Sequence, residues 1–86
     1  MPVCEFERSG ALRVAIVDET ELKFMANKAK RTLKSGDYAV HFFAKGNAGD
    51  AYTLNVTKPP SAVTAVKGTI DSSGKDAGLF WIQVKS

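Results

Sequence analysis

The hydrophobic positions of residues 11–17 alternate with polar or small ones. Leu12, Val14 and Ile16 occupy every second position. This spacing predicts a strand, because successive side chains of a strand point to opposite faces. A shorter strand is predicted just before it, over residues 3–8. The chain therefore begins with one or two strands.

The hydrophobic period changes over residues 19–35. Apolar side chains recur there three or four positions apart, the spacing of one face of an amphipathic helix: Leu22, Met25, Ala26, Ala29 and Leu33. Asp18, followed by Glu21, matches the capping box that begins a helix. Gly36 stands where a glycine often ends one. We therefore predict a single helix over residues 19–35.

Strand-like alternation returns after this segment. Residues 38–43 and 51–56 each alternate apolar with polar or small side chains, and a glycine-rich stretch, 46–50, separates them. A loop of that length makes Phe42 face Leu54, so that the apolar sets of both strands share one face. The pattern predicts a hairpin with a five-residue loop.

Two further strands are predicted over 62–70 and 78–84, after the Pro59-Pro60 pair that ends the preceding strand. With 86 residues the chain has room for one core. We predict one globular α+β domain, residues 1–86. In it, one amphipathic helix packs on a mainly antiparallel sheet of four to six strands, one or two of which precede the helix.

The composition narrows the chemistry. Cys4 is the only cysteine and His41 the only histidine, which excludes an intramolecular disulfide and the usual Cys- and His-based metal sites. A nucleophile needs a base within reach, and nothing in the sequence brings Cys4 and His41 together. No targeting segment or apolar stretch of about 20 residues is present. We therefore expect no catalysis, cofactor, metal or membrane, and a cytoplasmic location.

The formal net charge of +3 is unevenly distributed. Residues 1–22 carry five acids against two bases, a balance of −3, and residues 23–86 carry ten bases against four acids, a balance of +6. Five of those bases fall on the predicted helix: Lys23, Lys28, Lys30, Arg31 and Lys34. Such a cluster suits nucleic-acid phosphates, although bases near the end of a helix are also what its dipole favours.

Aromatic residues provide a second candidate surface. Phe43 shares one side of its strand with His41 and Lys45, opposite the side that carries Phe42. Phe80 and Trp81 are adjacent, so one of them must point away from the core. Because a single helix covers only one face of a sheet, the other face stays open. The predicted partner-binding residues are His41, Phe43, Lys45, Phe80 and Trp81.

We therefore predict a small non-catalytic binding module of the inhibitor, adaptor or subunit type. It would engage a protein partner, or a second copy of itself, through an open sheet face or an edge strand. The alternative is a domain that binds single-stranded DNA or RNA through the five helix bases and the sheet aromatics. The first is favoured because the excess charge is modest and no known nucleic-acid motif is present.

Overall fold

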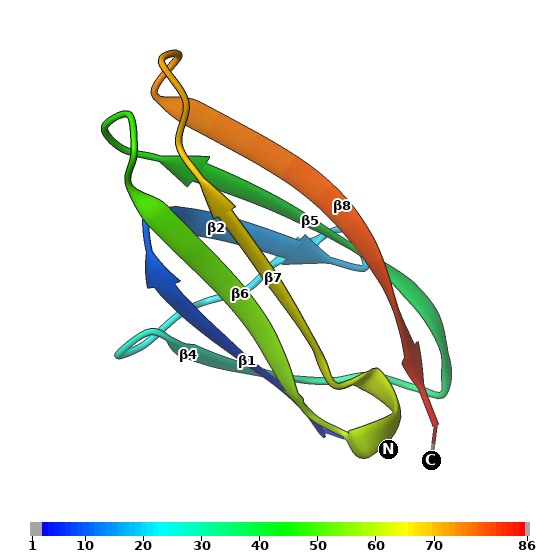
Figure 1. The fold of residues 1–86 in the computed structure, drawn as a ribbon. Helices are drawn as coiled ribbons and strands as arrows, with labels where there is room; N and C mark the ends of the chain where they lie inside the picture. Colours follow the sequence, from blue (N-terminus) through cyan, green and yellow to red (C-terminus); the bar gives the residue numbers. More distant parts are fainter. Residues whose placement is uncertain (1–2, 86) are drawn as a thin grey trace.

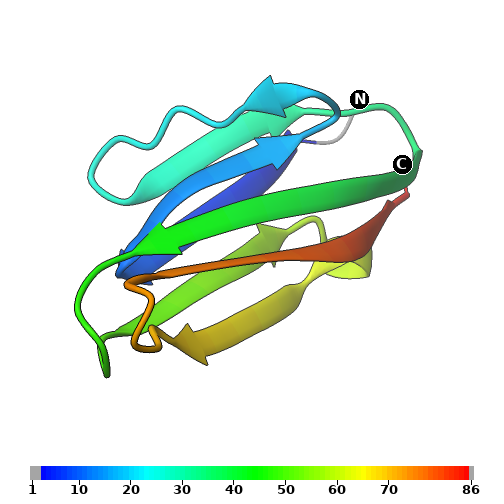
Figure 2. The same ribbon diagram turned by 90° about the horizontal axis from the view of Figure 1, so that it is seen from above.

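A computed structural model describes residues 3–85 of the chain. Its strands form two antiparallel four-stranded sheets (Figure 1). The first sheet has the strand order β4-β1-β6-β7 and the second has the order β3-β2-β5-β8. Figure 2 shows β5, in green, between β2 in blue and β8 in orange and red. The strands are β1 (Val3–Gly10), β2 (Leu12–Val17), β3 (Thr20–Glu21), β4 (Lys28–Thr32), β5 (Gly36–Lys45), β6 (Ala51–Lys58), β7 (Thr64–Thr69) and β8 (Lys75–Val84).

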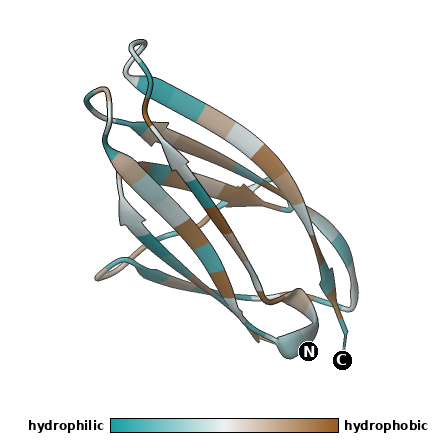
Figure 3. Cartoon of the chain, viewed as in Figure 1, coloured by the Kyte–Doolittle hydropathy of each residue, from teal (hydrophilic) through white to brown (hydrophobic). Residues whose placement is uncertain are grey.

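The core lies between the two sheets. Hydropathy alternates along β6 (Figure 3), and Leu54 and Val56 are both fully buried. The largest fully buried side chains come from both layers: Phe6, Leu12, Leu54, Val17, Val40, Val56, Val84 and Cys4. A sandwich of this kind buries one side of each sheet and leaves its other side facing outward.

The predicted helix over 19–35 is wrong, and the α+β class with it. The described residues contain no α-helix, only a short 3-10 turn between β6 and β7. Asp18 and Glu19, with φ of 51° and 63°, form the turn between β2 and β3. Ala26 and Asn27, with φ of 52° and 66°, form the next turn. These left-handed dihedrals suit hairpin turns and are incompatible with a continuous right-handed helix.

The helical spacing was misleading because two of its positions also fit a strand. Ala29 and Leu33 are four residues apart and both are buried, so they satisfy a period of two as well as one of 3.6. Arg31 lies on the same side between them and conceals the alternation. Its guanidinium donates to the Val17 carbonyl at 3.0 Å and lies 3.8 Å from the Asp18 carboxylate. A charged residue at the rim of the sandwich therefore made a strand resemble a helix.

The predicted hairpin is also wrong, although both of its strands and its loop over 46–50 form. β5 pairs with β2 and β8, whereas β6 pairs with β1 and β7. The loop therefore crosses from one sheet to the other. Phe42 and Leu54 are both buried, but they belong to different layers. Stacking two sheets buries an apolar strand face as well as pairing does, so alternation alone does not distinguish the two arrangements.

Candidate functional site

The outer side of the second sheet carries a patch that we name the aromatic face. It consists of alternate residues of three neighbouring strands: Val14, Ile16, Ala39, His41, Phe43, Ala77, Leu79 and Trp81. The register places these side chains in rows across the sheet, because directly paired residues share a face. His41 lies between Ile16 and Leu79, and Trp81 is paired with Ala39. The patch is therefore continuous over β2, β5 and β8.

Three large apolar side chains of this face are open to solvent. Trp81 is 66% exposed, Leu79 52% and Phe43 46%. The other large apolar side chains exposed among the described residues, Val3, Met25 and Val63, lie on other parts of the fold. A contiguous exposed apolar patch on a small protein commonly marks an interaction surface.

The structure brings together four of the five predicted partner-binding residues. His41, Phe43, Lys45 and Trp81 lie on the outer side of β5 and β8. Phe80 points the other way, with its ring centroid 6.1 Å from that of Phe42. Of the adjacent aromatic pair, Trp81 is therefore the outward residue and Phe80 supports the core.

Sequence analysis missed the contribution of β2. It placed Leu12 and Val14 on one side of the strand, but the register shifts between these two residues. Leu12 is buried, whereas Val14 and Ile16 are only partly covered and lie on the aromatic face. A bulge at Arg13 turns the strand over between them. The sequence indicates this change of side only if one extra residue is allowed in the alternation between Leu12 and Val14.

A second layer of aromatic rings fixes β8 beneath this face. The Phe42 ring centroid lies 5.9 Å from that of Tyr52, and a Cβ at Gly78 would come 2.4 Å from the Phe42 Cζ. The Tyr52 hydroxyl donates a hydrogen bond to the Asp76 carboxylate. This bond, more than burial, raises the pKa of Tyr52 to about 12. These contacts connect β6 of the first sheet to the second sheet. They hold the strands that carry the aromatic face against the first sheet.

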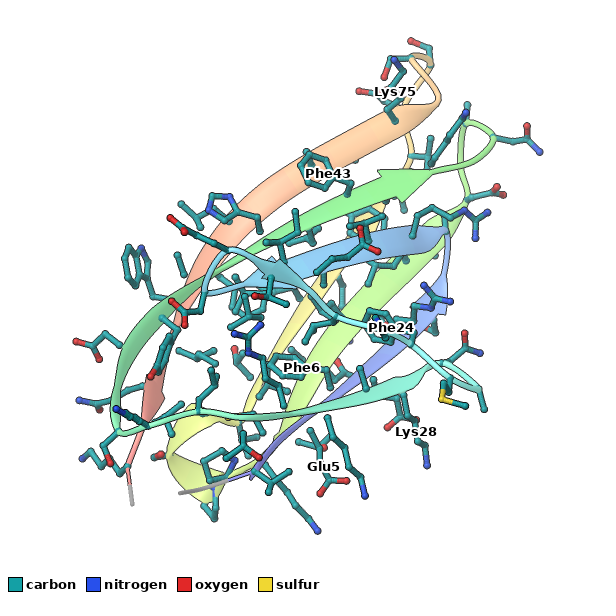
Figure 4. All side chains as sticks on the ribbon, turned by 180° about the vertical axis from the view of Figure 1, so that it is seen from behind. Glu5, Phe6, Phe24, Lys28, Phe43 and Lys75 are labelled. Carbon is teal, nitrogen blue, oxygen red and sulfur yellow. The ribbon has the colours of Figure 1, made fainter. Side chains whose placement is uncertain are left out.

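A groove with basic walls lies at one end of the aromatic face. Its volume is about 530 Å³. Arg13, Lys45 and Lys75 line it together with Phe43, and Figure 4 labels Phe43 and Lys75 in this region. Asp76 also lines the groove, but its carboxylate accepts the tyrosine hydrogen bond. The groove therefore presents mainly positive charge beside an aromatic ring.

A groove with acidic walls lies at the other end. Its volume is about 360 Å³, and Asp18, Glu19 and Asp37 line it beside Ala39 and His41. The Asp18 carboxylate lies 3.8 Å from the Arg31 guanidinium, whereas Glu19 and Asp37 form no ion pair with another residue in the described part of the chain. The aromatic face thus has positive charge at one end of its strands and negative charge at the other.

The five bases of the nucleic-acid alternative do not form one face. Two of them, Lys28 and Lys30, project outward from β4 opposite Glu7 and Glu5 of β1. Figure 4 shows Glu5 and Lys28 extending from the same side of the sheet. The third, Arg31, lies at the rim of the sandwich, where its guanidinium donates to the Val17 carbonyl. The other two, Lys23 and Lys34, lie in the connections before and after β4.

Acids from β1 offset part of this positive charge. The Glu5 carboxylate lies 3.0 Å from the Lys58 ammonium and 3.9 Å from that of Lys30. The hydrogen bond from Lys58, ahead of the charge of Lys30, lowers the pKa of Glu5. The acidic beginning of the chain and the basic segment that follows are thus paired across neighbouring strands, where opposite charges attract.

The groups considered for catalysis lie apart. Cys4 is buried in β1 of the first sheet, and burial raises the pKa of its thiol. His41 is exposed on the aromatic face of the second sheet. Within residues 3–85 no three His, Cys, Asp or Glu side chains are grouped so as to hold a metal ion. The same residues include no helix with the length and apolar character needed to cross a membrane.

The fold and the aromatic face together define a small antiparallel β-sandwich with one open apolar sheet surface. Comparisons with protein-family models, curated proteins and solved structures found no match to the chain. The function is therefore inferred from the geometry of this surface.

Proposed function

We propose that this chain is a small non-catalytic binding module whose aromatic face engages a protein partner. The observation that carries the proposal is the exposure of Phe43, Leu79 and Trp81 on one continuous sheet surface. Leaving such area in water is unfavourable by about 25 cal/mol for each Å² of apolar surface. A partner that covers it recovers that free energy.

The chemistry of the face resembles the centre of a protein interface. Tryptophan is among the residues most enriched at binding hot spots, and apolar centres are commonly surrounded by a polar rim. Here Trp81 and Leu79 are two residues apart and lie side by side on the outer side of β8. Charged residues are found at both ends of the face. The rigid strand backbone holds the side chains in a fixed arrangement, which reduces the entropy lost on binding.

Nucleic-acid binding is the less favoured alternative. Trp81 is paired with Ala39, which lines the acidic groove, so stacking of bases on Trp81 would bring phosphates near Glu19 and Asp37, which would repel them. The bases of β4 lie on the other sheet and face acids.

We also propose a cytoplasmic location, because the single thiol, Cys4, is buried and has no partner cysteine in the chain.

Site-specific photo-cross-linking tests the proposed function. A photoreactive phenylalanine analogue at position 79 or 81 is compared with one at Val63, which is 59% exposed outside the aromatic face. The purified variants are irradiated alone and in extract of the source cells. We expect a discrete cross-linked product from positions 79 and 81 and none from position 63. Equal labelling from all three positions, or none from the aromatic face, would contradict the proposal.

A further inference from the structure

The two charged ends of the aromatic face are complementary to each other. Lys45 and Lys75 are directly paired at the basic end, and Asp37 lies at the opposite end of β5. Arg13 lines the basic groove and Glu19 the acidic one. A strand rises about 3.3 Å per residue, so Lys45 and Asp37 lie about 26 Å apart along β5. A surface with this polarity suits a partner whose charges run in the opposite direction.

A second copy of the chain provides that reversed arrangement. A twofold axis in the plane of the face, perpendicular to the strands, reverses the strand direction of the second copy. When the axis passes through His41, a residue n positions after His41 lies over the residue n positions before it. Lys45 then lies over Asp37 of the second copy, and the basic groove lies over the acidic one. Each such contact occurs twice.

The same axis also matches large side chains with small ones. Phe43 is paired with Ala77 in one row, and Trp81 is paired with Ala39 in another. The two rows lie at equal distances on either side of His41. The twofold rotation therefore places Phe43 over Ala39 and Trp81 over Ala77 of the second copy. In the row on the axis, Ile16, His41 and Leu79 each lie over the same residue of the second copy. The large-on-small matching therefore applies to the two rows on either side of the axis, where it allows close packing.

Other arrangements of two copies are less favourable. An axis parallel to the strands would place each row over its equivalent, so that Lys45 would approach the basic end of the second copy. Addition of a strand along the free edge of β8 meets another obstacle. The Ser61 hydroxyl donates to the Gln83 carbonyl at 2.9 Å and accepts from the Lys85 amide at 3.1 Å. These bonds occupy the end of that edge.

We propose that the partner of the aromatic face is a second copy of this chain, related by a twofold axis at His41 that runs perpendicular to the strands. The inference rests on the proposed function, which requires only that some protein covers the face. Three strands about 4.8 Å apart make a patch smaller than a standard interface of about 800 Å² per partner. The dimer therefore belongs with the small, weakly and reversibly associating interfaces.

Sedimentation velocity of the purified full chain, from about 1 µM to about 1 mM, measures this association. The expected result is a reversible monomer–dimer equilibrium. Lys45→Glu places like charges together at both symmetric contacts and weakens the dimer by about tenfold or more. The double variant Lys45→Glu/Asp37→Lys restores opposite charges across the axis and recovers most of the affinity. Lys67→Glu changes the net charge equally on the first sheet and has little effect.

Three results would overturn the inference: a monomer throughout the concentration range, equal weakening by Lys45→Glu and Lys67→Glu, or no recovery in the double variant. Circular dichroism spectra of the variants establish that each is folded. If the purified chain stays monomeric but cross-links from position 81 to a different protein in extract, the second-copy inference fails and the proposed function stands. If neither association nor cross-linking is seen, both fail.

Discussion

The hydroxyl of Tyr52 on β6 donates a hydrogen bond to the carboxylate of Asp76 on β8. The two strands belong to different sheets, so this bond joins the layers at the basic end of the aromatic face. Tyr52 is buried, and a hydrogen bond to a charged acceptor is stronger than one between neutral groups. The pair therefore holds β8, which carries Leu79 and Trp81, in place against the first sheet.

Tyr52→Phe is expected to lower the free energy of unfolding by about 1.5–3 kcal/mol. The substitution removes the donor to Oδ2 of the partly buried Asp76 carboxylate, which then keeps only the Ala77 amide at its Oδ1. Urea denaturation followed by circular dichroism measures the change. Tyr38→Phe is the control, because the Tyr38 hydroxyl is exposed and donates only to the Lys34 carbonyl. An equal loss in the two variants would contradict the role given to the Tyr52 bond.

The same bond predicts a pH dependence at high pH. The pKa of Tyr52 is raised to about 12 in the folded chain, above the ordinary value of about 10. A pKa that is higher in the folded state means that the stabilisation is fully present below pH 10 and is lost as the pH rises through 12. The stability difference between the wild type and Tyr52→Phe should therefore shrink over this range. A difference that grows between pH 10 and pH 12 would be inconsistent with this assignment.

Gly78→Ala is expected to destabilise the fold by about 1–3 kcal/mol, because the new Cβ would lie 2.4 Å from the Phe42 Cζ. The double variant Gly78→Ala/Phe42→Leu removes the ring that causes the clash. Thermal unfolding of the two single variants and the double variant gives their coupling. We expect the double variant to lose less stability than the sum of the two single changes. If the stability losses of the two single variants simply add in the double variant, the Phe42 ring is not the reason that position 78 needs a glycine.

Arg8 holds the connection between β3 and β4 against the first sheet. Its guanidinium lies 4.5 Å from the centroid of the Phe24 ring and donates to the Arg13 carbonyl at 2.7 Å. Arg8→Met keeps the aliphatic stem and should cost about 1–2 kcal/mol of stability. Lys67→Met on the exposed side of β7 is the control. Unchanged denaturation midpoints for Arg8→Met would show that these contacts contribute little.

The acids of β1 explain why the basic segment does not form an uninterrupted positive surface. Replacing Glu5 and Glu7 by Gln removes the negative charges opposite Lys30 and Lys28. The double variant should bind single-stranded DNA more tightly than the wild type at low salt, and this gain should disappear at high salt. Fluorescence anisotropy with a labelled oligonucleotide measures both. Tight, salt-sensitive binding by the wild type itself would favour the nucleic-acid alternative.

Alternation predicted the strands well because it follows directly from strand geometry. The segments around Leu54 and Phe42 were placed in strands, and Phe43 was placed on the opposite side from Phe42, as the structure confirms. The same local pattern could not show which strands pair. Phe42 and Leu54 would share a buried face either in a hairpin or across a sandwich, and long-range contacts decide between them.

The helix was predicted wrongly, and the extent of the site was missed, for local physical reasons. Ala29 and Leu33 fit two periods, and Arg31 hid the strand period by occupying an inward position at the rim. The bulge after Leu12 moved Val14 to the outer side, which periodicity without an insertion does not allow. Both errors arise where a single residue interrupts an otherwise regular pattern.

The fluorescence of Trp81, the only tryptophan in the chain, tests the open aromatic face most directly. The emission spectrum and its quenching by acrylamide are recorded as the folded protein is diluted. At low concentration we predict the long-wavelength emission of an indole in water and strong quenching, followed by a shift to shorter wavelength and weaker quenching as the concentration rises. Short-wavelength emission and protection from acrylamide at the lowest concentration would show a buried ring and contradict the open face.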